Sequence, residues 1–267
     1  MEMKKLTLLK LGGSLITDKS SPFTARDETI RRLCREIKEA LDEKPVPLVV
    51  GHGGGSFPHQ SAAKYQTHKG EIDEKSWEGI CVVQNDAAKL NRIIVDALLE
   101  ADVKAMSVQP SASFVTERVR IKEYYTKPIE FLLEKGIIPV PYGDVGLDLK
   151  QGMCIVSTEE ILFFLAQKLG AKRVIFCGKT DGVFTADPGK DEKAKLIKEI
   201  TRKNFGKVKG YLTDSDGTDV TGGMLHKVER ALEIAGKGVT VEIINGEKAG
   251  VLKRALLGEE GIGTVIR

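Results

Sequence analysis

Short apolar runs alternate with amphipathic stretches along most of this chain, and few folds accommodate that alternation. Residues 6–11, 46–50 and 173–177 are mostly apolar, whereas residues 28–42 carry their apolar side chains at helical spacing. Strands that are apolar on both faces need cover on both sides, and helices between successive parallel strands provide it. The sequence therefore predicts an α/β fold with a mainly parallel central sheet.

The same alternation predicts the remaining elements. We expect further helices over residues 76–101, 129–135, 159–169 and 225–236, and further strands over residues 104–108, 137–140 and 240–244. Residues 187–210 form the most polar stretch, and we expect them to leave the sheet as a mobile surface excursion. No repeat or Pro/Ser-rich linker divides the chain, and 267 residues with 41% hydrophobic content suffice for one large core.

The charge balance and the cysteines exclude several classes of function. The chain has 41 basic and 38 acidic residues, and a net charge of +3 gives no reason to expect nucleic-acid binding. No apolar run reaches the length of a membrane span, and the N-terminus lacks the pattern of a signal peptide, so we expect a cytoplasmic protein. The four cysteines form no CxxC motif, which predicts buried, reduced thiols rather than a metal or redox site.

Glycine clusters follow three of the expected strands. Lys10 precedes Gly12-Gly13-Ser14, residues 51–55 contain four glycines, and Asp181-Gly182 comes soon after residue 177. Ligands of parallel sheets bind at the carboxyl ends of the strands, where glycines let backbone N–H groups approach phosphate oxygens. Each cluster alone is also compatible with an ordinary turn or a flexible loop. Their joint occurrence on one rim favours phosphate binding.

Two further features can supply charge to such a rim. His59 lies just past the second glycine cluster and can donate to a phosphate oxygen, whereas we expect His52 to be structural. Residues 219–227 place Thr221 as an N-cap and Lys227 about one turn into a helix, from which it can reach back to phosphate. A capped helix with a solvated lysine is the alternative interpretation.

Together these motifs resemble those of the amino acid kinase superfamily and, within it, the isopentenyl phosphate kinase family. The matching segments run from Lys10 to Arg267 and include residues 53–59, 67–70, 141–145, 219–224 and 263–267. The resemblance implies a three-layer α/β/α sandwich in a single domain, residues 1–267, with an acceptor-binding lobe over about 1–170 and a nucleotide-binding lobe over about 171–267. It also implies ATP-dependent phosphorylation of isopentenyl phosphate to isopentenyl diphosphate.

The resemblance also implies a role for individual residues. The expected ATP-binding residues are Lys10, Gly12, Gly13, Ser14, Gly55, Asp181, Gly182, Gly223 and Lys227. The expected acceptor-binding residues are Gly54, His59 and Thr158. The expected catalytic residues are Lys10, Lys19, His59 and Lys227, with Lys19 bridging the donor and acceptor phosphates. We further expect Mg²⁺ on the nucleotide oxygens without a direct protein ligand, and a homodimer.

Elementary chemistry agrees with these roles. The attacking oxygen belongs to a phosphate that is already anionic near neutral pH, so the site needs positive charge between two anions rather than a strong base. An isoprenoid tail would need an apolar pocket. Its candidates on the long helix are Trp77, Ile80, Val83 and Ala87, although ordinary core packing explains that stripe as well.

Three departures from the family pattern bear on the identity of the acceptor more than on the kinase reaction itself. Pro58 replaces the usual glycine before the histidine, Thr158-Glu159 replaces Gly-Asp, and Lys179 stands in the run before Asp181. A kinase acting on another small phosphate or phosphonate, such as fosfomycin, is one alternative. A non-catalytic nucleotide sensor is the other.

Overall fold

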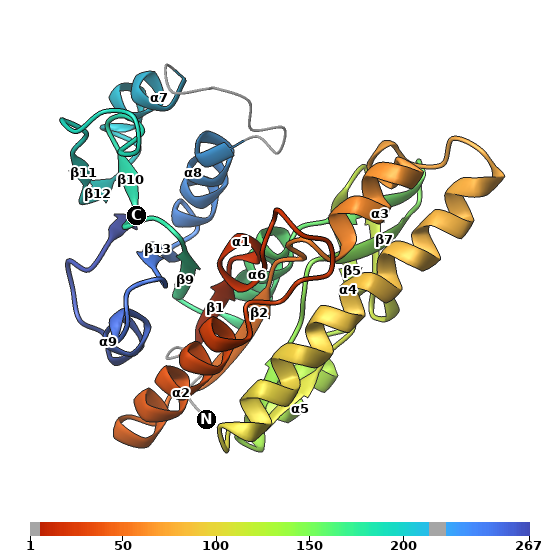
Figure 1. The fold of residues 1–267 in the computed structure, drawn as a ribbon, viewed down its shortest axis with the longest axis horizontal. Coiled ribbons are helices and arrows are strands. Elements are labelled where there is room, and N and C mark those ends of the chain that lie inside the picture. The colour runs from red at the N-terminus through yellow and green to blue at the C-terminus, as the bar shows by residue number, and fades with distance from the viewer. Residues whose placement is uncertain (1–5, 214–222) are drawn as a thin grey trace.

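A six-stranded sheet forms the middle layer of the molecule in a computed structural model that describes residues 6–213 and 223–267 (Figure 1). Its strand order is β12-β14-β13-β9-β1-β2. The strands are β1 (Thr7–Leu11), β2 (Leu48–His52), β9 (Arg173–Gly178), β12 (Glu199–Ile200), β13 (Thr240–Asn245) and β14 (Thr264–Ile266). All neighbours pair in parallel except β13 and β14, which are antiparallel. The predicted mainly parallel sheet is confirmed.

Helices cover both faces of this sheet because its strands alternate apolar side chains between two cores. In β1, Leu8 joins one core cluster and Leu9 joins the other. The first cluster includes residues of α6 (Thr158–Leu169) and α8 (Gly223–Ala235). The second includes residues of α2 (Asp27–Glu43), α4 (Glu74–Glu100) and α9 (Val251–Leu257). The fold is therefore the expected three-layer α/β/α sandwich, with one hydrophobic core on each side of the sheet.

Two smaller sheets extend the molecule beyond β2. The parallel pair β3 (Ala105–Ser107) and β6 (Ile138–Val140) adjoins β2 through a bridge between His52 and Tyr142. A four-stranded sheet has the order β5-β4-β7-β8. Its strands are β4 (Phe114–Glu117), β5 (Arg120–Tyr124), β7 (Asp144–Asp148) and β8 (Gly152–Val156). The remaining elements are α1 (Gly13–Ile16), α3 (Pro58–Tyr65), α5 (Lys127–Glu134), α7 (Phe205–Thr213), β10 (Val183–Phe184), β11 (Leu196–Ile197) and two short 3₁₀ turns, Thr67–Lys69 and Pro110–Ala112.

The prediction that residues 187–210 only form a surface excursion was wrong. Within this stretch β12 pairs with β14 at the outer edge of the main sheet, and β11 pairs with β10. Ile200 of β12 is fully buried. Strands of two residues leave no continuous apolar run, so their place in the sheet has no signal in the local sequence.

The expectation for the cysteines holds for three of four residues. Cys34, Cys154 and Cys177 are buried and unpaired, whereas Cys81 on α4 is exposed, which corrects the expectation that all four are buried. Within the described part of the chain, no helix is both long enough and apolar enough to cross a bilayer.

Candidate active site

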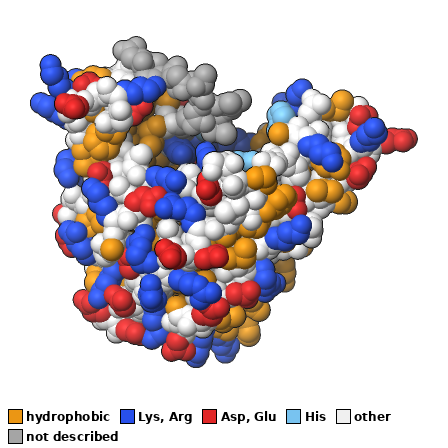
Figure 2. Space-filling view, in the orientation of Figure 1, with side chains coloured by type: hydrophobic (Ala, Val, Ile, Leu, Met, Phe, Trp, Pro, Cys, Tyr) orange, Lys and Arg blue, Asp and Glu red, His pale blue; other side chains and the backbone are white. Residues whose placement is uncertain are grey.

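A cavity of about 700 Å³ opens at the carboxyl ends of β1, β2 and β9. Figure 2 shows the molecule hollowed there, with blue Lys or Arg and pale blue His side chains at the hollow. The predicted site residues that line it are Lys10, Gly12, Gly13, Ser14, Lys19, Gly54, Gly55, His59, Thr158 and Lys227. The structure thus gathers four separated segments of the chain around one cavity.

Two other predicted residues, Asp181 and Gly182, do not line the cavity as it stands. Asp181 accepts from Asn245 Nδ2 at 3.2 Å and pairs with Lys248 Nζ at 2.6 Å. A Cβ added to Gly182 would lie 2.3 Å from Thr264 Oγ1, so this glycine is required by packing. Gly223 is the first residue of α8, and residues 219–222, including the expected N-cap Thr221, lie outside the described residues. The roles of Asp181, Gly182 and Gly223 in ATP binding stay predictions.

The first two glycine clusters pack against each other through their backbones. A Cβ added to Gly13 would lie 2.5 Å from the backbone nitrogen of Gly55, and one added to Gly53 would lie 2.9 Å from that of Gly13. Gly55 also has a φ of 55°, a conformation that favours glycine. No side chain fits between these loops, so backbone amide groups form that part of the cavity wall.

Lys10 forms a shielded ion pair with Glu159 on α6. Their side chains are only 12% and 17% exposed. Burial lowers the pKa of Lys10 below its ordinary value, although the carboxylate opposes this shift. Burial alone would raise the pKa of Glu159, but the charge and hydrogen bond of Lys10 outweigh it and hold that pKa below its ordinary value. The positive charge of Lys227 acts on both groups, so all three lie near each other.

Glu159 is a functional candidate that stands out in the sequence only as a departure from the family pattern. Its partner, Lys10, lies 149 residues away in the sequence. The sequence held one signal for its role: the resembled family usually has an acidic residue, aspartate, at this position. The structure adds that the longer glutamate side chain still reaches a lysine of the cavity.

Lys19 and His59 lie near each other in the wall of the cavity. Lys19 follows Asp18, whose carboxylate accepts from the backbone N–H and the hydroxyl of Ser20 at 2.8 and 2.7 Å and so shapes the loop. His59 is the second residue of α3, at the helix end where partial positive charge accumulates. Loss of surrounding water and, secondly, the charge of Lys19 lower the pKa of His59 below its ordinary value of 6.5.

His52 is structural, as expected. Its ring is fully buried; Asn91 Nδ2 donates to its Nε2 at 3.1 Å, and its Nδ1 donates to the carbonyl of Gly53 at 3.1 Å. Burial is the main reason why its pKa falls to about 4. The ring therefore stays neutral at physiological pH and holds the second glycine cluster in place.

Two of the three departures have a clear structural role. Pro58 is the first residue of α3, a position where a backbone N–H has no hydrogen-bond partner within the helix. A Cβ added to Gly54 would lie 2.4 Å from Cγ of the Pro58 ring. Thr158 is buried, and its hydroxyl donates to the carbonyl of His52 at 2.6 Å. Thr158 therefore fixes the start of α6 against β2 while it lines the cavity.

Lys179, the third departure, contributes a further cation to the cavity wall. Its nearest carboxylate, on Glu247, is 3.9 Å away and already accepts two hydrogen bonds from Arg26, at 2.5 and 3.0 Å. The ammonium of Lys179 is therefore only weakly held.

The wall beside His59 is apolar. Side chains that line it include Pro58, Ala62, Val83, Ala87 and Ile155. Of the four residues expected to form a tail pocket, Val83 and Ala87 therefore line the cavity. Ile80 packs in a small separate core, and Trp77 is exposed, with its Nε1–H donating to Glu71 at 2.8 Å.

Among the described residues, each carboxylate that lines the cavity is already engaged. Asp144 accepts from the backbone N–H groups of Ser111 and Val145 at 3.0 and 2.9 Å, and burial raises its pKa to about 6. Glu159 pairs with Lys10, and Glu160 pairs with two arginines. In residues 6–213 and 223–267 no group of three acidic, His or Cys side chains is arranged to hold a metal ion. This donor set fits a Mg²⁺ that is held by nucleotide oxygens.

Comparisons with known proteins point to one family. A model of the amino acid kinase family matches residues 5–245. The chain is similar to the isopentenyl phosphate kinase of Methanocaldococcus jannaschii, with 36% identity over 263 residues that cover 95% of this chain and 96% of the relative. The isopentenyl phosphate kinase of Methanothermobacter thermautotrophicus is 38% identical over 269 residues, 98% of each chain. An X-ray structure of isopentenyl phosphate kinase superposes with a TM-score of 0.84 and 35% identity, covering 98% of this chain and 100% of that one.

Proposed function

The chain belongs to the amino acid kinase family, and we propose that it transfers the γ-phosphoryl group of ATP to isopentenyl phosphate. The observation that carries this proposal is the convergence of Lys10, Lys19, His59 and Lys227 on one cavity with an apolar wall. The cations suit two facing phosphates, and the apolar wall suits a short hydrocarbon tail. Full-length similarity to isopentenyl phosphate kinases supports the same acceptor.

The proposed reaction needs positioning and charge rather than covalent help. An oxygen of the acceptor phosphate attacks the γ-phosphorus, and the bond from that phosphorus to the bridging oxygen of ADP breaks. Lys10, Lys19 and Lys227 would stabilise the charge on the transferred group, and His59 would hold the acceptor phosphate. Mg²⁺, when bound to the nucleotide, would neutralise part of the donor charge.

An acceptor panel tests the proposal directly. Purified protein with Mg-ATP would be given isopentenyl phosphate, geranyl phosphate, fosfomycin and buffer alone, and diphosphate or phosphonate products followed by mass spectrometry. We expect isopentenyl phosphate to lead in kcat/KM by more than about tenfold, since its tail matches the small apolar wall. Preferred turnover of fosfomycin would favour the phosphonate alternative. Nucleotide binding without turnover of any acceptor would favour the sensor.

Replacing His59 with glutamine should weaken acceptor binding while ATP affinity stays nearly constant. We expect kcat/KM for isopentenyl phosphate to fall about 30-fold, the effect of losing one charge-assisted hydrogen bond of about 2 kcal/mol. The measurement is steady-state kinetics with each substrate varied in turn. An unchanged kcat/KM would remove His59 from the site.

The lowered pKa of His59 also gives acceptor binding a pH dependence. Free His59 is mostly neutral at pH 7, and a bound phosphate dianion favours the imidazolium, so binding should take up a proton. Affinity should therefore fall as the pH rises through the higher pKa of the bound state. Calorimetry in buffers of different ionisation enthalpy measures the uptake. The His59→Gln protein should show only the proton change that belongs to the substrate phosphate.

The proposal includes a homodimer, as the resemblance implies, and a cytoplasmic location, as expected from the sequence. Multi-angle light scattering of the purified chain would distinguish a dimer from a monomer. Fractionation of the native cells would test the location.

A further inference from the structure

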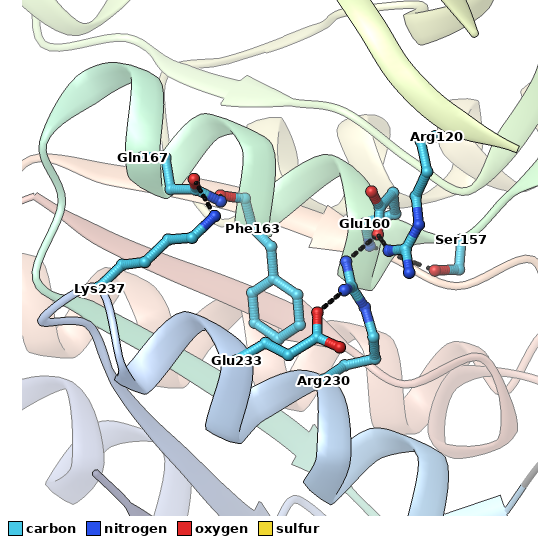
Figure 3. Close-up of polar contacts among 8 residues, drawn as sticks. All are labelled: Arg120, Ser157, Glu160, Phe163, Gln167, Arg230, Glu233 and Lys237. Carbon is cyan, nitrogen blue, oxygen red and sulfur yellow. Dashed lines mark hydrogen bonds and ion pairs between the residues drawn. The ribbon is translucent and has the colours of Figure 1, made fainter. Parts of the chain in front are cut away.

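The cavity wall contains a charge cluster that the proposed reaction does not use. Figure 3 shows Glu160 between two arginines that come from different elements. Its Oε2 accepts from Arg120 Nη1 at 3.1 Å and from Arg230 Nη2 at 2.5 Å. Arg120 begins β5, Glu160 lies in the first turn of α6, and Arg230 lies on α8. We call these three residues the Glu160 clasp.

The contact with Arg230 is the stronger half of the clasp. The side chains of Arg230 and Glu160 are 17% and 19% exposed, whereas that of Arg120 is 57% exposed. Ion pairs that are partly shielded from water are screened less than exposed ones. Arg230 also donates to Glu233 of its own helix, so its guanidinium is held from two sides. The clasp therefore fixes α8 against the first turn of α6.

Arg230 shares its helix face with Lys227. Residues three apart on a helix are neighbours, and both of these side chains line the cavity. Lys227 is exposed and forms no ion pair within the described segments of the chain. The position of its ammonium therefore depends on where α8 lies, which the clasp determines.

The other half of the clasp reaches a turn of the four-stranded sheet. The turn between β4 and β5 contains Arg118 and Val119 with φ of 51° and 67°, and Asp148 accepts their N–H groups at 3.1 and 2.8 Å. Val119 lines the cavity, and Arg120 follows it directly. One carboxylate thus joins the helix that carries Lys227 to a turn in the wall of the same cavity.

From these contacts we infer that Glu160 is a positioning residue for phosphoryl transfer. Through Arg230 it holds α8 in the place where Lys227 can stabilise the transferred group. The inference rests on the proposed function, because it gives Lys227 a catalytic role. It assigns no contact between Glu160 and either substrate.

The test is whether Glu160 acts through Lys227. Glu160→Gln keeps the shape of the side chain and removes its charge, and a misplaced Lys227 should lower kcat by about 10- to 100-fold with a much smaller change in KM for ATP and acceptor. In a Lys227→Met background the same substitution should lower kcat less than about threefold, because the group that it positions is gone. Equal factors in both backgrounds would overturn the inference.

A second contact between the same two regions provides the control. Lys237, just after α8, donates to Gln167 of α6 at 2.7 Å, and neither residue lines the cavity (Figure 3). Lys237→Met should therefore leave kcat unchanged. If it lowers kcat as much as Glu160→Gln does, the clasp is only one of several structural contacts and the inference fails.

Two further readouts keep the outcomes distinct. Arg230→Lys retains the charge but cannot keep both carboxylate contacts, so its kcat should lie between those of the wild type and Glu160→Gln. If the Glu160→Gln protein does not fold, Arg230→Lys takes its place in the test. Wild-type protein that does not turn over isopentenyl phosphate would contradict the proposed function instead. The coupling of Glu160 to Lys227 would then be measured with whichever acceptor of the panel is phosphorylated.

Discussion

Replacing Lys19 with methionine is expected to lower kcat by about 10²- to 10³-fold while the KM for ATP changes little. This lysine lies on an exposed loop beside His59, and its charge lowers the pKa of that histidine. A charge between donor and acceptor phosphates matters most when the phosphoryl group is in transit, and loss of one such preorganised group costs an enzyme about this factor. Rapid-quench measurement of a single turnover would isolate the chemical step.

The matched control is Lys64→Met on α3. Lys64 lies over the ring of Tyr65 and does not line the cavity, so its loss removes the same charge from the same region without touching the site. We expect wild-type kcat for this protein. A Lys19→Met protein that retains its kcat would exclude Lys19 from the reaction.

Replacing Glu159 with glutamine is expected to have an effect of similar size and to reduce stability as well. It leaves the buried ammonium of Lys10 without its counter-charge, which should destabilise the fold by about 3 kcal/mol. We expect kcat/KM to fall about 100-fold, because an ammonium that loses its carboxylate is held less firmly and loses its proton more easily. Chemical denaturation and steady-state kinetics measure the two effects separately.

The pH dependence of the Glu159→Gln protein has a definite sign. Burial already lowers the pKa of Lys10, and Glu159 opposes that shift, so the substitution should lower this pKa further and move the alkaline limb of the rate profile to lower pH. Between the lowered pKa and 10.5 the unfolded chain binds more protons than the folded one, so the stability of this variant should rise with pH across that window. Glu242→Gln is the control: it breaks the pair of Arg173 with Glu242, which is also 17% exposed but lies outside the cavity. The alkaline limb of the rate profile of Glu242→Gln should stay at its wild-type pH.

The sequence predicted four strands of the main sheet, β1, β2, β9 and β13, and its large helices, because their apolar patterns are long enough to recognise. The two short edge strands β12 and β14 were not predicted. The helix expected over residues 76–101 is α4 (Glu74–Glu100), and the strand expected over residues 173–177 is β9. The four-stranded sheet was not predicted. Its strands β5 and β7 carry charged residues such as Arg120 and Asp144, which interrupt the apolar pattern of a strand. The two hairpins β4–β5 and β7–β8 meet only through Thr116 and Asp148, which lie 32 residues apart, so no local pattern shows that they form one sheet.

The site was predictable in its loops and less so in its electrostatics. Glycines beside Lys10 and His59 predict phosphate-binding segments from the sequence alone, and the structure brings these segments to one cavity. Two ion pairs of the site join residues that are far apart in the sequence. Lys10 and Glu159 are 149 positions apart, and Glu160 and Arg230 are 70 positions apart. Charges are abundant in the sequence, and only the fold shows which of them meet.

The acidic first turn of α6 has a consequence for where anions settle. A helix start attracts negative charge, and α6 begins in the cavity wall with Thr158, Glu159 and Glu160. The chain has filled that attractive position with two carboxylates of its own, each neutralised by a cation from elsewhere. In the proposed reaction the start of α6 would therefore not attract the substrate phosphates, whereas the start of α3, beside the glycine loops, has no acidic residue in its first turn.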